Sequence, residues 1–188
     1  GLGDYIAWFY IAQGIVSIFM PAIMGIIADK YVQPQRLLGI SHLLAASLML
    51  VAAYFGYEAT LAANAAAAAG IEGYVGDIWP IFIPYVMSVA FYMPTLALSN
   101  SVAYTSLEQG GYDTVKAFPP IRVFGTVGFI VAMLICDFAG FQANYMQFYQ
   151  CALIGICLAL YTMALPHCPV SKAQGDKSLM QRLGLDAF

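Results

Sequence analysis

Charged side chains are scarce in this chain of 188 residues: 9% of them are Asp, Glu, Lys or Arg, and 62% are hydrophobic. Soluble domains carry about 25% charged residues, so this composition excludes an ordinary water-soluble domain. The mean hydropathy of +0.78 agrees with that exclusion. The net charge of -3 identifies no partner, because in a membrane the placement of charge matters more than its sum.

Motifs for metal binding and catalysis are also lacking. The four cysteines form no Cys-x-x-Cys pair and no Cys/His metal spacing, and they are interpreted as small apolar packing residues: Cys136, Cys151, Cys157 and Cys168. The apolar segments contain no nucleophile motif and no paired carboxylates, which argues against an enzyme. No cofactor, no metal and no nucleic-acid partner are predicted. The start at Gly1 has no basic region followed by a small-residue cleavage site, so it is not a signal peptide.

Five apolar segments are long enough to cross a bilayer, which takes about 20 mainly apolar residues. We therefore predict an all-α polytopic membrane protein with spans at about 5–27, 37–54, 78–104, 120–138 and 145–165. The tract Leu61–Gly70 is mostly alanine. It either prolongs the second span or forms a short helix outside the membrane.

The seven Lys and Arg residues all fall on one predicted side of the membrane. They follow the first span, the third span and the fifth span, or begin the fourth: Lys30, Arg36, Lys116, Arg122, Lys172, Lys177 and Arg182. The segment between spans two and three holds Glu58, Glu72 and Asp77 but no cation. The positive-inside rule makes the basic side cytoplasmic, so the residue-1 side is expected outside and the tail inside.

An odd number of spans that starts outside predicts a further helix before Gly1. Six helices would form half of a twelve-helix transporter. Residues 1–170 would then be a partial N-terminal bundle, and residues 171–188 would begin the cytoplasmic connector to a second half.

The first span ends in Gly25-Ile-Ile-Ala-Asp29-Lys30. This segment resembles the G-x-x-x-D-[RK] loop signature of the major facilitator superfamily, although the second glycine and the paired basic residues of the full signature are absent. Gly25 would allow close helix approach, and an Asp at a helix C-terminus is better placed if it meets a donor. The alternative is a solvated Asp29–Lys30 pair at a membrane exit.

Polar side chains line one face of the third span at spacings of four, three and four: Ser88, Tyr92, Thr95 and Ser99. Pro84 and Pro94 interrupt the same helix and free carbonyl groups near this stripe. The stripe as a whole is interpreted as part of a cavity wall, although each hydroxyl taken singly is somewhat better explained by bonding to its own helix and packing against a neighbour. In the first span, Gln13 and Ser17 suit cavity lining and helix packing about equally.

Arg122 opens the fourth span, directly after Pro119 and Pro120. A guanidinium in a membrane helix is costly unless something requires it. Thr126 and Phe129 lie four and seven residues on, so charge, hydroxyl and ring share one helical face. The alternative is an arginine that extends to the interface as a topology anchor. The prolines, which suit a first helical turn, and the shared face favour the binding interpretation.

Several segments, in collinear order, resemble bacterial nucleoside permeases of the nucleoside:proton symporter family, within the major facilitator superfamily. The segment F-P-P-I-R-V-F-G-T-V-G-F at 118–129 is similar to the start of that family's fifth helix. The other segments are F-M-P-A-I-M-G-I-I-A-D at 19–29, Y-M-P-T-L at 92–96, L-P-H-C-P-V at 165–170 and L-G-L-D-A-F at 183–188. The loop 58–77 is the exception.

The resemblance implies proton-coupled nucleoside uptake by alternating access in the bacterial cytoplasmic (inner) membrane. In the family, the matching residues of the fifth helix contact the nucleoside, which assigns substrate binding to Arg122, Thr126 and Phe129. The resemblance also implies that the first helix, the second half and the proton-carrying carboxylates lie outside this chain. The partners expected are a nucleoside, protons, the lipid bilayer and those missing parts.

Two other functions remain open. A facilitator carrier for a sugar would use a similar hydroxyl-rich cavity, and only the family segments argue against it. A non-transporting scaffold or sensor subunit would need no convergence of polar faces, and an Arg122 directed at lipid headgroups would support it.

Overall fold

The computed structural model describes residues 2–169, all of them in helices or connecting loops. Five long helices are present: α1 (Ile6–Lys30), α2 (Pro34–Ala68), α3 (Trp79–Gln109), α4 (Thr114–Phe138) and α5 (Met146–Tyr161). Two short 3-10 helices flank them, η1 (Leu2–Tyr5) and η2 (Thr162–Ala164). Each long helix, α5 together with η2, has the length and hydropathy to cross a membrane, which confirms the prediction of five membrane-length helices. The predicted connector 171–188 lies outside the described residues.

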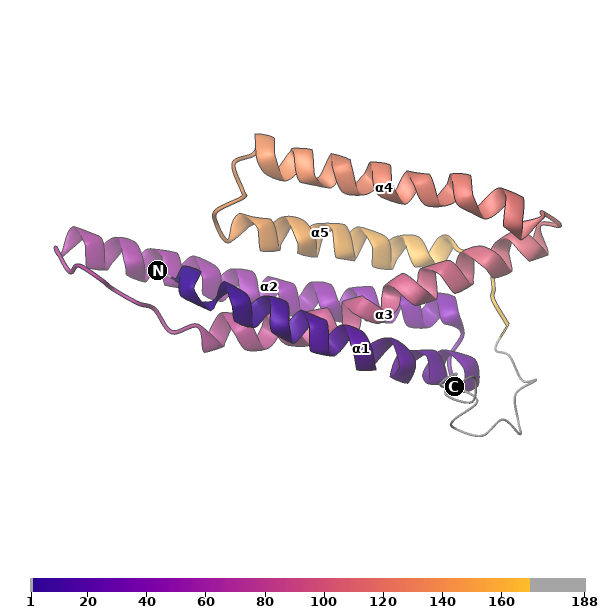
Figure 1. Ribbon diagram of the computed structural model, residues 1–188, viewed down its shortest axis with the longest axis horizontal. Coiled ribbons are helices and arrows are strands. Elements are labelled where there is room, and N and C mark those ends of the chain that lie inside the picture. The colour runs from indigo at the N-terminus through magenta and orange to yellow at the C-terminus, as the bar shows by residue number, and fades with distance from the viewer. Residues whose placement is uncertain (1, 170–188) are drawn as a thin grey trace.

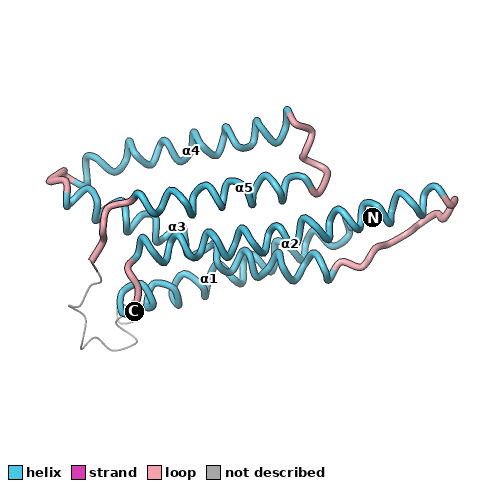
Figure 2. Tube along the Cα trace, turned by 180° about the vertical axis from the view of Figure 1, so that it is seen from behind, coloured by secondary structure: helices cyan, strands magenta, loops and turns pink. Residues whose placement is uncertain are grey.

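In Figure 1, α4 and α5 lie above α1, α2 and α3. α2 packs against both α3 and α5, and α1 packs mainly against α3, while α4 makes its main contacts with the end of α3. Figure 2 shows the same arrangement from behind, with α4 as the outermost helix next to α5. Because successive helices run in opposite directions, Lys30, Arg36 and Lys116 gather at one end of the bundle, called here the basic end. The other end, called the cation-free end, holds Asp77 and Asp137.

The alanine tract prolongs α2, which settles the alternative left open by the sequence. α2 continues without a break through Ala68, over 35 residues. At 1.5 Å per residue it is about 52 Å long, whereas a bilayer core is about 30 Å thick. The last turns of α2 therefore extend beyond the membrane at the cation-free end, or the helix tilts strongly.

The start of α4 differs from the prediction. The prolines were expected in its first turn, near residue 120, but the helix begins at Thr114 and holds Pro119 and Pro120 inside it. The reason is a stronger start signal upstream, since the side chain of Asp113 accepts a hydrogen bond from the backbone N–H of Val115 at 3.0 Å. Asp is among the best residues at this capping position.

Replacing Asp113 with alanine should lower the free energy of unfolding by about 1 kcal/mol, the usual cost of a lost cap. Asn caps as well as Asp, so Asp113→Asn should be nearly neutral. The exposed ion pair from Lys116 Nζ to Asp113 Oδ2, at 3.7 Å, should contribute little, because exposed pairs are worth less than about 1 kcal/mol. Thermal unfolding in detergent compares the two variants, and equal losses in both would assign the effect to charge instead of capping.

Small residues allow α2 and α5 to approach closely. Ala52 and Ala152 are fully buried, at 0% exposure. A Cβ atom built on Gly155 would lie 3.0 Å from the Ala46 Cβ, and one built on Gly56 would lie 2.8 Å from the Tyr145 Cβ. Such contacts are typical of helices that pack in lipid, where close backbone approach replaces hydrophobic driving force.

The segment after η2 folds back under the basic end. Cys168, at 1% exposure, packs in an apolar cluster whose other members come from α1, α2 and α3: Met24, Ala28, Leu37, Leu38, Leu98 and Val102. Its burial raises the pKa of the Cys168 thiol. Nearby, Gln33 and Gln35 contact the ring of His167, and Gln109 Nε2 donates to the His167 carbonyl oxygen at 2.9 Å. These contacts fix the exit of the fifth span to the first three helices.

Candidate functional site

Arg122 lies on α4, the helix least covered by the rest of the described chain. Every residue from Pro119 to Val131 is exposed. Within residues 2–169 the guanidinium of Arg122 has no hydrogen-bond or ion-pair partner. A charge in a membrane helix needs partners, so the partner of this arginine is a ligand, water, lipid headgroups or protein beyond the described residues.

The face of α4 that carries Arg122 lies next to the side by which α4 contacts its neighbours. The contact side of α4 is marked by Phe118, whose ring stacks on Tyr104 with centroids 4.2 Å apart, and by Ala132, whose carbonyl oxygen accepts from Gln150 Nε2 at 2.8 Å. At about 100° per residue, Arg122, Thr126 and Phe129 lie roughly 40°, 80° and 20° around the helix from Phe118. Arg122 and Phe129 therefore border the contact side of α4, and Thr126 lies further around the helix, about 120° from Ala132.

Two glycines on the same side leave room beside these residues. Gly125 and Gly128 lie about 20° and 80° from Phe118, in the opposite sense to Arg122. A Cβ atom built on either glycine meets no heavy atom within 4 Å. Glycines in membrane helices often mark a close approach of a neighbouring helix, but no such approach is present at Gly125 and Gly128 in the part of the chain that the structure describes. The side of α4 that faces the bundle has open space at the level of Arg122.

The predicted cavity residues of α1 and α3 are only partly available to a ligand. Gln13 is half-buried, and Ser17, also half-buried, donates its hydroxyl to the Gln13 carbonyl oxygen at 2.6 Å. Tyr92 is 41% exposed, and its ring meets the buried His42 edge-on at 6.3 Å. Ser99 is exposed and donates to the Leu96 carbonyl oxygen at 3.0 Å.

Thr95 is a correction to the predicted cavity wall. Its side chain is buried, at 2% exposure, and its hydroxyl donates to the Tyr92 carbonyl oxygen at 2.6 Å. Ser88 is likewise buried and donates to the Ala45 carbonyl oxygen on α2 at 2.8 Å. The physical reason is that Ser and Thr hydroxyls can donate their hydrogen bonds to backbone carbonyl oxygens. In α3, which contains two prolines, such a carbonyl lies within reach of Thr95. The polar stripe therefore divides into a packed pair and an exposed pair, Tyr92 and Ser99.

The motif at the end of α1 keeps only part of its expected geometry. A Cβ atom on Gly25 would meet no heavy atom within 4 Å, so the predicted close helix approach is absent among the described residues. Asp29 and Lys30 are the last two residues of α1, and their side chains lie outside the described part. Their predicted role in the conformational loop stays a prediction.

The chemistry of the α4 face suits a small polar solute with a flat ring. Arg122 offers five N–H donors in a planar fork, and Thr126 offers one donor and two acceptors. Phe129, 65% exposed, offers a ring about two helical turns from Arg122. The span from Arg122 to Phe129 is about 10 Å along the helix, which is the scale of one nucleoside-sized molecule.

An aromatic pocket at the cation-free end was not predicted from the sequence. It is lined by residues from η1, α1, the loop before α3 and α3 itself, among them Trp8 and Trp79. Both tryptophans of the chain are in it. Their position at the outer ends of two spans was the available signal.

Comparisons with known proteins agree on one family. The sequence pattern of the family described as Nucleoside H+ symporter matches residues 2–188. The nucleoside permease NupG of Escherichia coli (strain K12) is 37% identical over 186 residues, covering 99% of this chain and 40% of that protein. The xanthosine permease of the same organism is 39% identical, with the same coverage. A crystal structure of a mutant of the nucleoside transporter NupG superposes with a TM-score of 0.80 at 37% identity, covering 96% of this chain and 40% of that one.

The chain thus spans about two fifths of the length of the relatives it matches, 40% in both permeases. These relatives are permeases and not enzymes. Their structural likeness gives this all-helical chain the fold of a major-facilitator-type transporter.

Proposed function

This chain belongs to the Nucleoside H+ symporter family, and from that membership we propose that it is part of the N-terminal half of a proton-coupled nucleoside carrier. It is a multi-pass membrane protein with five membrane-length helices. In this proposal the described helices are spans two to six of the N-terminal half. Residues 1–170 form the bundle and residues 171–188 begin the connector to the second half.

The observation that supports nucleoside binding is that Arg122 lacks a hydrogen-bond or ion-pair partner among the described residues. Its guanidinium lies beside open space on the bundle-facing side of α4. In this proposal the guanidinium donates to ribose or base oxygens, Thr126 adds a hydroxyl, and Phe129 packs on the ring. A lipid-facing anchor would instead occupy the opposite side of α4, near Val127, about 180° from Phe118.

Alternating access requires a second half that rocks against this one around a central site. The exposed length of α4 from Pro119 to Val131 is the surface we assign to that site. Asp and Glu residues in the five spans lie only near the ends of the spans, and none lies in the middle of the membrane. The coupling proton is therefore assigned to carboxylates of the second half.

The orientation follows from charge. We assign the basic end, with Lys30, Arg36 and Lys116, to the cytoplasm and the cation-free end to the outside of a bacterial inner membrane. Cysteine labelling from each side of intact cells would test this assignment.

Uptake of labelled uridine by the full-length protein in cells tests the proposed function. We expect saturable uptake that unlabelled nucleosides compete for, that sugars leave unchanged, and that a proton uncoupler abolishes. Competition by a sugar alone would identify a different facilitator carrier. Absence of any uptake by a protein that reaches the membrane would favour the scaffold alternative.

A further inference from the structure

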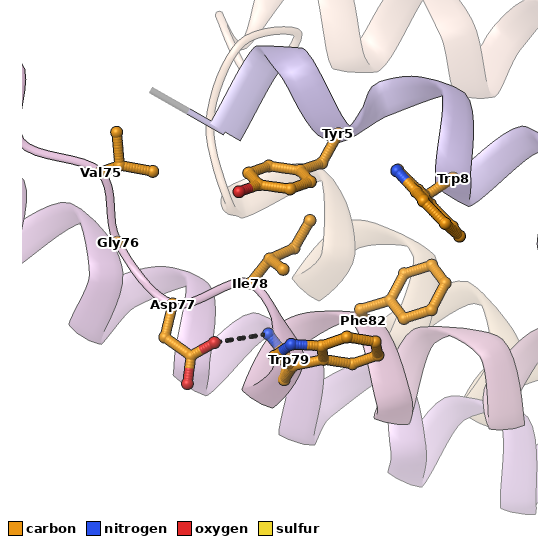
Figure 3. Close-up of a pocket in the computed structure, with 8 residues that line it drawn as sticks. All are labelled: Tyr5, Trp8, Val75, Gly76, Asp77, Ile78, Trp79 and Phe82. Atoms are coloured by element: carbon orange, nitrogen blue, oxygen red, sulfur yellow. Dashed lines mark hydrogen bonds between the residues drawn. The ribbon is translucent and has the colours of Figure 1, made fainter.

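A pocket of about 480 Å³ opens at the cation-free end, between the start of α1 and the start of α3 (Figure 3). Tyr5 and Trp8 line it from the side of η1 and α1. Asp77, Trp79 and Phe82 line it from the side of α3. Its volume lies within the usual range of small-ligand sites, about 300 to 1,000 Å³.

The aromatic wall of the pocket is held in place by ring contacts. Phe82 meets Trp79 edge-on, with centroids 5.8 Å apart, and meets Phe9 in the same way at 5.2 Å. Trp8 and Trp79 are nonetheless each 59% exposed. The pocket is therefore lined by two large rings that the described residues leave more than half exposed, and aromatic rings of this kind stack on nucleobases.

The pocket has one charged group at its rim. Asp77 Oδ1 accepts a hydrogen bond from the backbone N–H of Trp79 at 3.1 Å, which positions the carboxylate next to the tryptophan. The second carboxylate oxygen has no partner among the described residues. A carboxylate only accepts hydrogen bonds, so it suits the hydroxyls of a ribose or the amino group of a base.

The charge around the pocket excludes a phosphate ligand. The loop between α2 and α3 carries Glu72 and Asp77 with no Lys or Arg, so a nucleotide would meet repulsion and no cationic partner there. A neutral nucleoside meets neither obstacle. The pocket also lies at the end opposite Arg122, which is 16 residues, or about 24 Å, from the end of α4 at the cation-free side.

We propose that this pocket is an entry station, which binds a neutral nucleoside by stacking on Trp8 and Trp79 before the nucleoside reaches Arg122. The inference rests on the proposed function and adds a second binding site to it. Tryptophan and tyrosine also gather at membrane interfaces as anchors. The alternative occupant of the pocket is a lipid chain, which brominated lipid would detect.

The test uses tryptophan fluorescence of the full-length transporter in lipid nanodiscs. Because Trp8 and Trp79 are the two tryptophans of this chain, the signal removed by the double variant W8F/W79F reports on the pocket. Uridine and adenosine should quench that signal and uridine monophosphate should not. In transport assays W8L and W79L should each raise the KM for nucleosides about tenfold. Removing an aromatic side chain on which a base stacks costs about 1 to 3 kcal/mol, and about 1.4 kcal/mol corresponds to a factor of ten. Phe138→Leu, an exposed aromatic at the same end outside the pocket, should leave the KM unchanged.

The variant Arg122→Ala separates this inference from the proposed function. Quenching that persists in Arg122→Ala while uptake falls identifies two sites. Quenching that disappears together with uptake would overturn the entry station, because the signal would then report the α4 site. Quenching by brominated lipid that nucleosides do not relieve, or an unchanged KM in well-expressed W8L and W79L, would also overturn it while nucleoside uptake by the wild type continued. Absence of nucleoside uptake by the wild type would count against the proposed function itself.

Discussion

Replacing Arg122 with alanine is expected to lower nucleoside uptake by roughly 10- to 100-fold at subsaturating substrate. Hydrogen bonds to a charged group contribute about 1.5 to 3 kcal/mol, and about 1.4 kcal/mol corresponds to a factor of ten. Loss of the guanidinium removes those donors from the face of α4 that borders the bundle. The unfolding temperature should stay near that of the wild type, since Arg122 has no partner among the described residues to lose.

Two further variants make this prediction specific. Arg122→Lys keeps the charge but loses the planar fork, so it should restore only part of the activity. Arg36→Ala removes an exposed arginine at the same basic end, at the start of α2, and should leave uptake unchanged. Equal losses in Arg36→Ala and Arg122→Ala would show that only the charge of the basic end matters, as a topology anchor requires.

Replacing Gly56 with valine is expected to destabilise the bundle by about 3 kcal/mol, at the upper part of the usual cost of overpacking. A Cβ atom at Gly56 would lie 2.8 Å from the Tyr145 Cβ. The Tyr145 Cβ is attached directly to its backbone and cannot rotate away, so α2 and the start of α5 would have to separate. The measurement is the thermal or denaturant unfolding midpoint of the detergent-solubilised protein.

Gly14→Val provides the matched control. Gly14 lies inside α1, and a Cβ atom there meets no heavy atom within 4 Å among the described residues. The intrinsic helix preference of the substitution is the same at both positions. A loss at Gly14 as large as that at Gly56 would show that lipid-embedded glycines resist substitution in general, independent of the contact with Tyr145.

The course of the chain through the membrane was predictable because hydropathy and charge placement act over whole segments. Five spans and their alternation followed from runs of apolar residues and from the positions of Lys30, Arg36 and Lys116. The ends of the spans were less predictable, because they depend on single contacts. Asp113 caps α4 well before the prolines, and the alanine tract continues α2 because nothing in it stops a helix.

The candidate site was predictable only as a helical face. The positions of Arg122, Thr126 and Phe129 on one side of α4 follow from helix geometry alone. Helix geometry alone does not predict whether a polar side chain of α3 is exposed or buried. Thr95 and Tyr92 lie three residues apart on the same predicted stripe, yet Thr95 is buried and Tyr92 is exposed. That difference depends on how α3 packs on its neighbours, which periodicity does not specify. The pocket of Trp8 and Trp79 was missed for the same reason, since it joins two segments distant in sequence.

The most direct test of the account is a high-resolution structure of the full-length transporter with a bound nucleoside. We expect the ligand beside α4, with the Arg122 guanidinium within about 2.7 to 3.2 Å of its oxygens and the Phe129 ring against it. A bound nucleoside remote from α4, with Arg122 extended to the lipid headgroups, would contradict it.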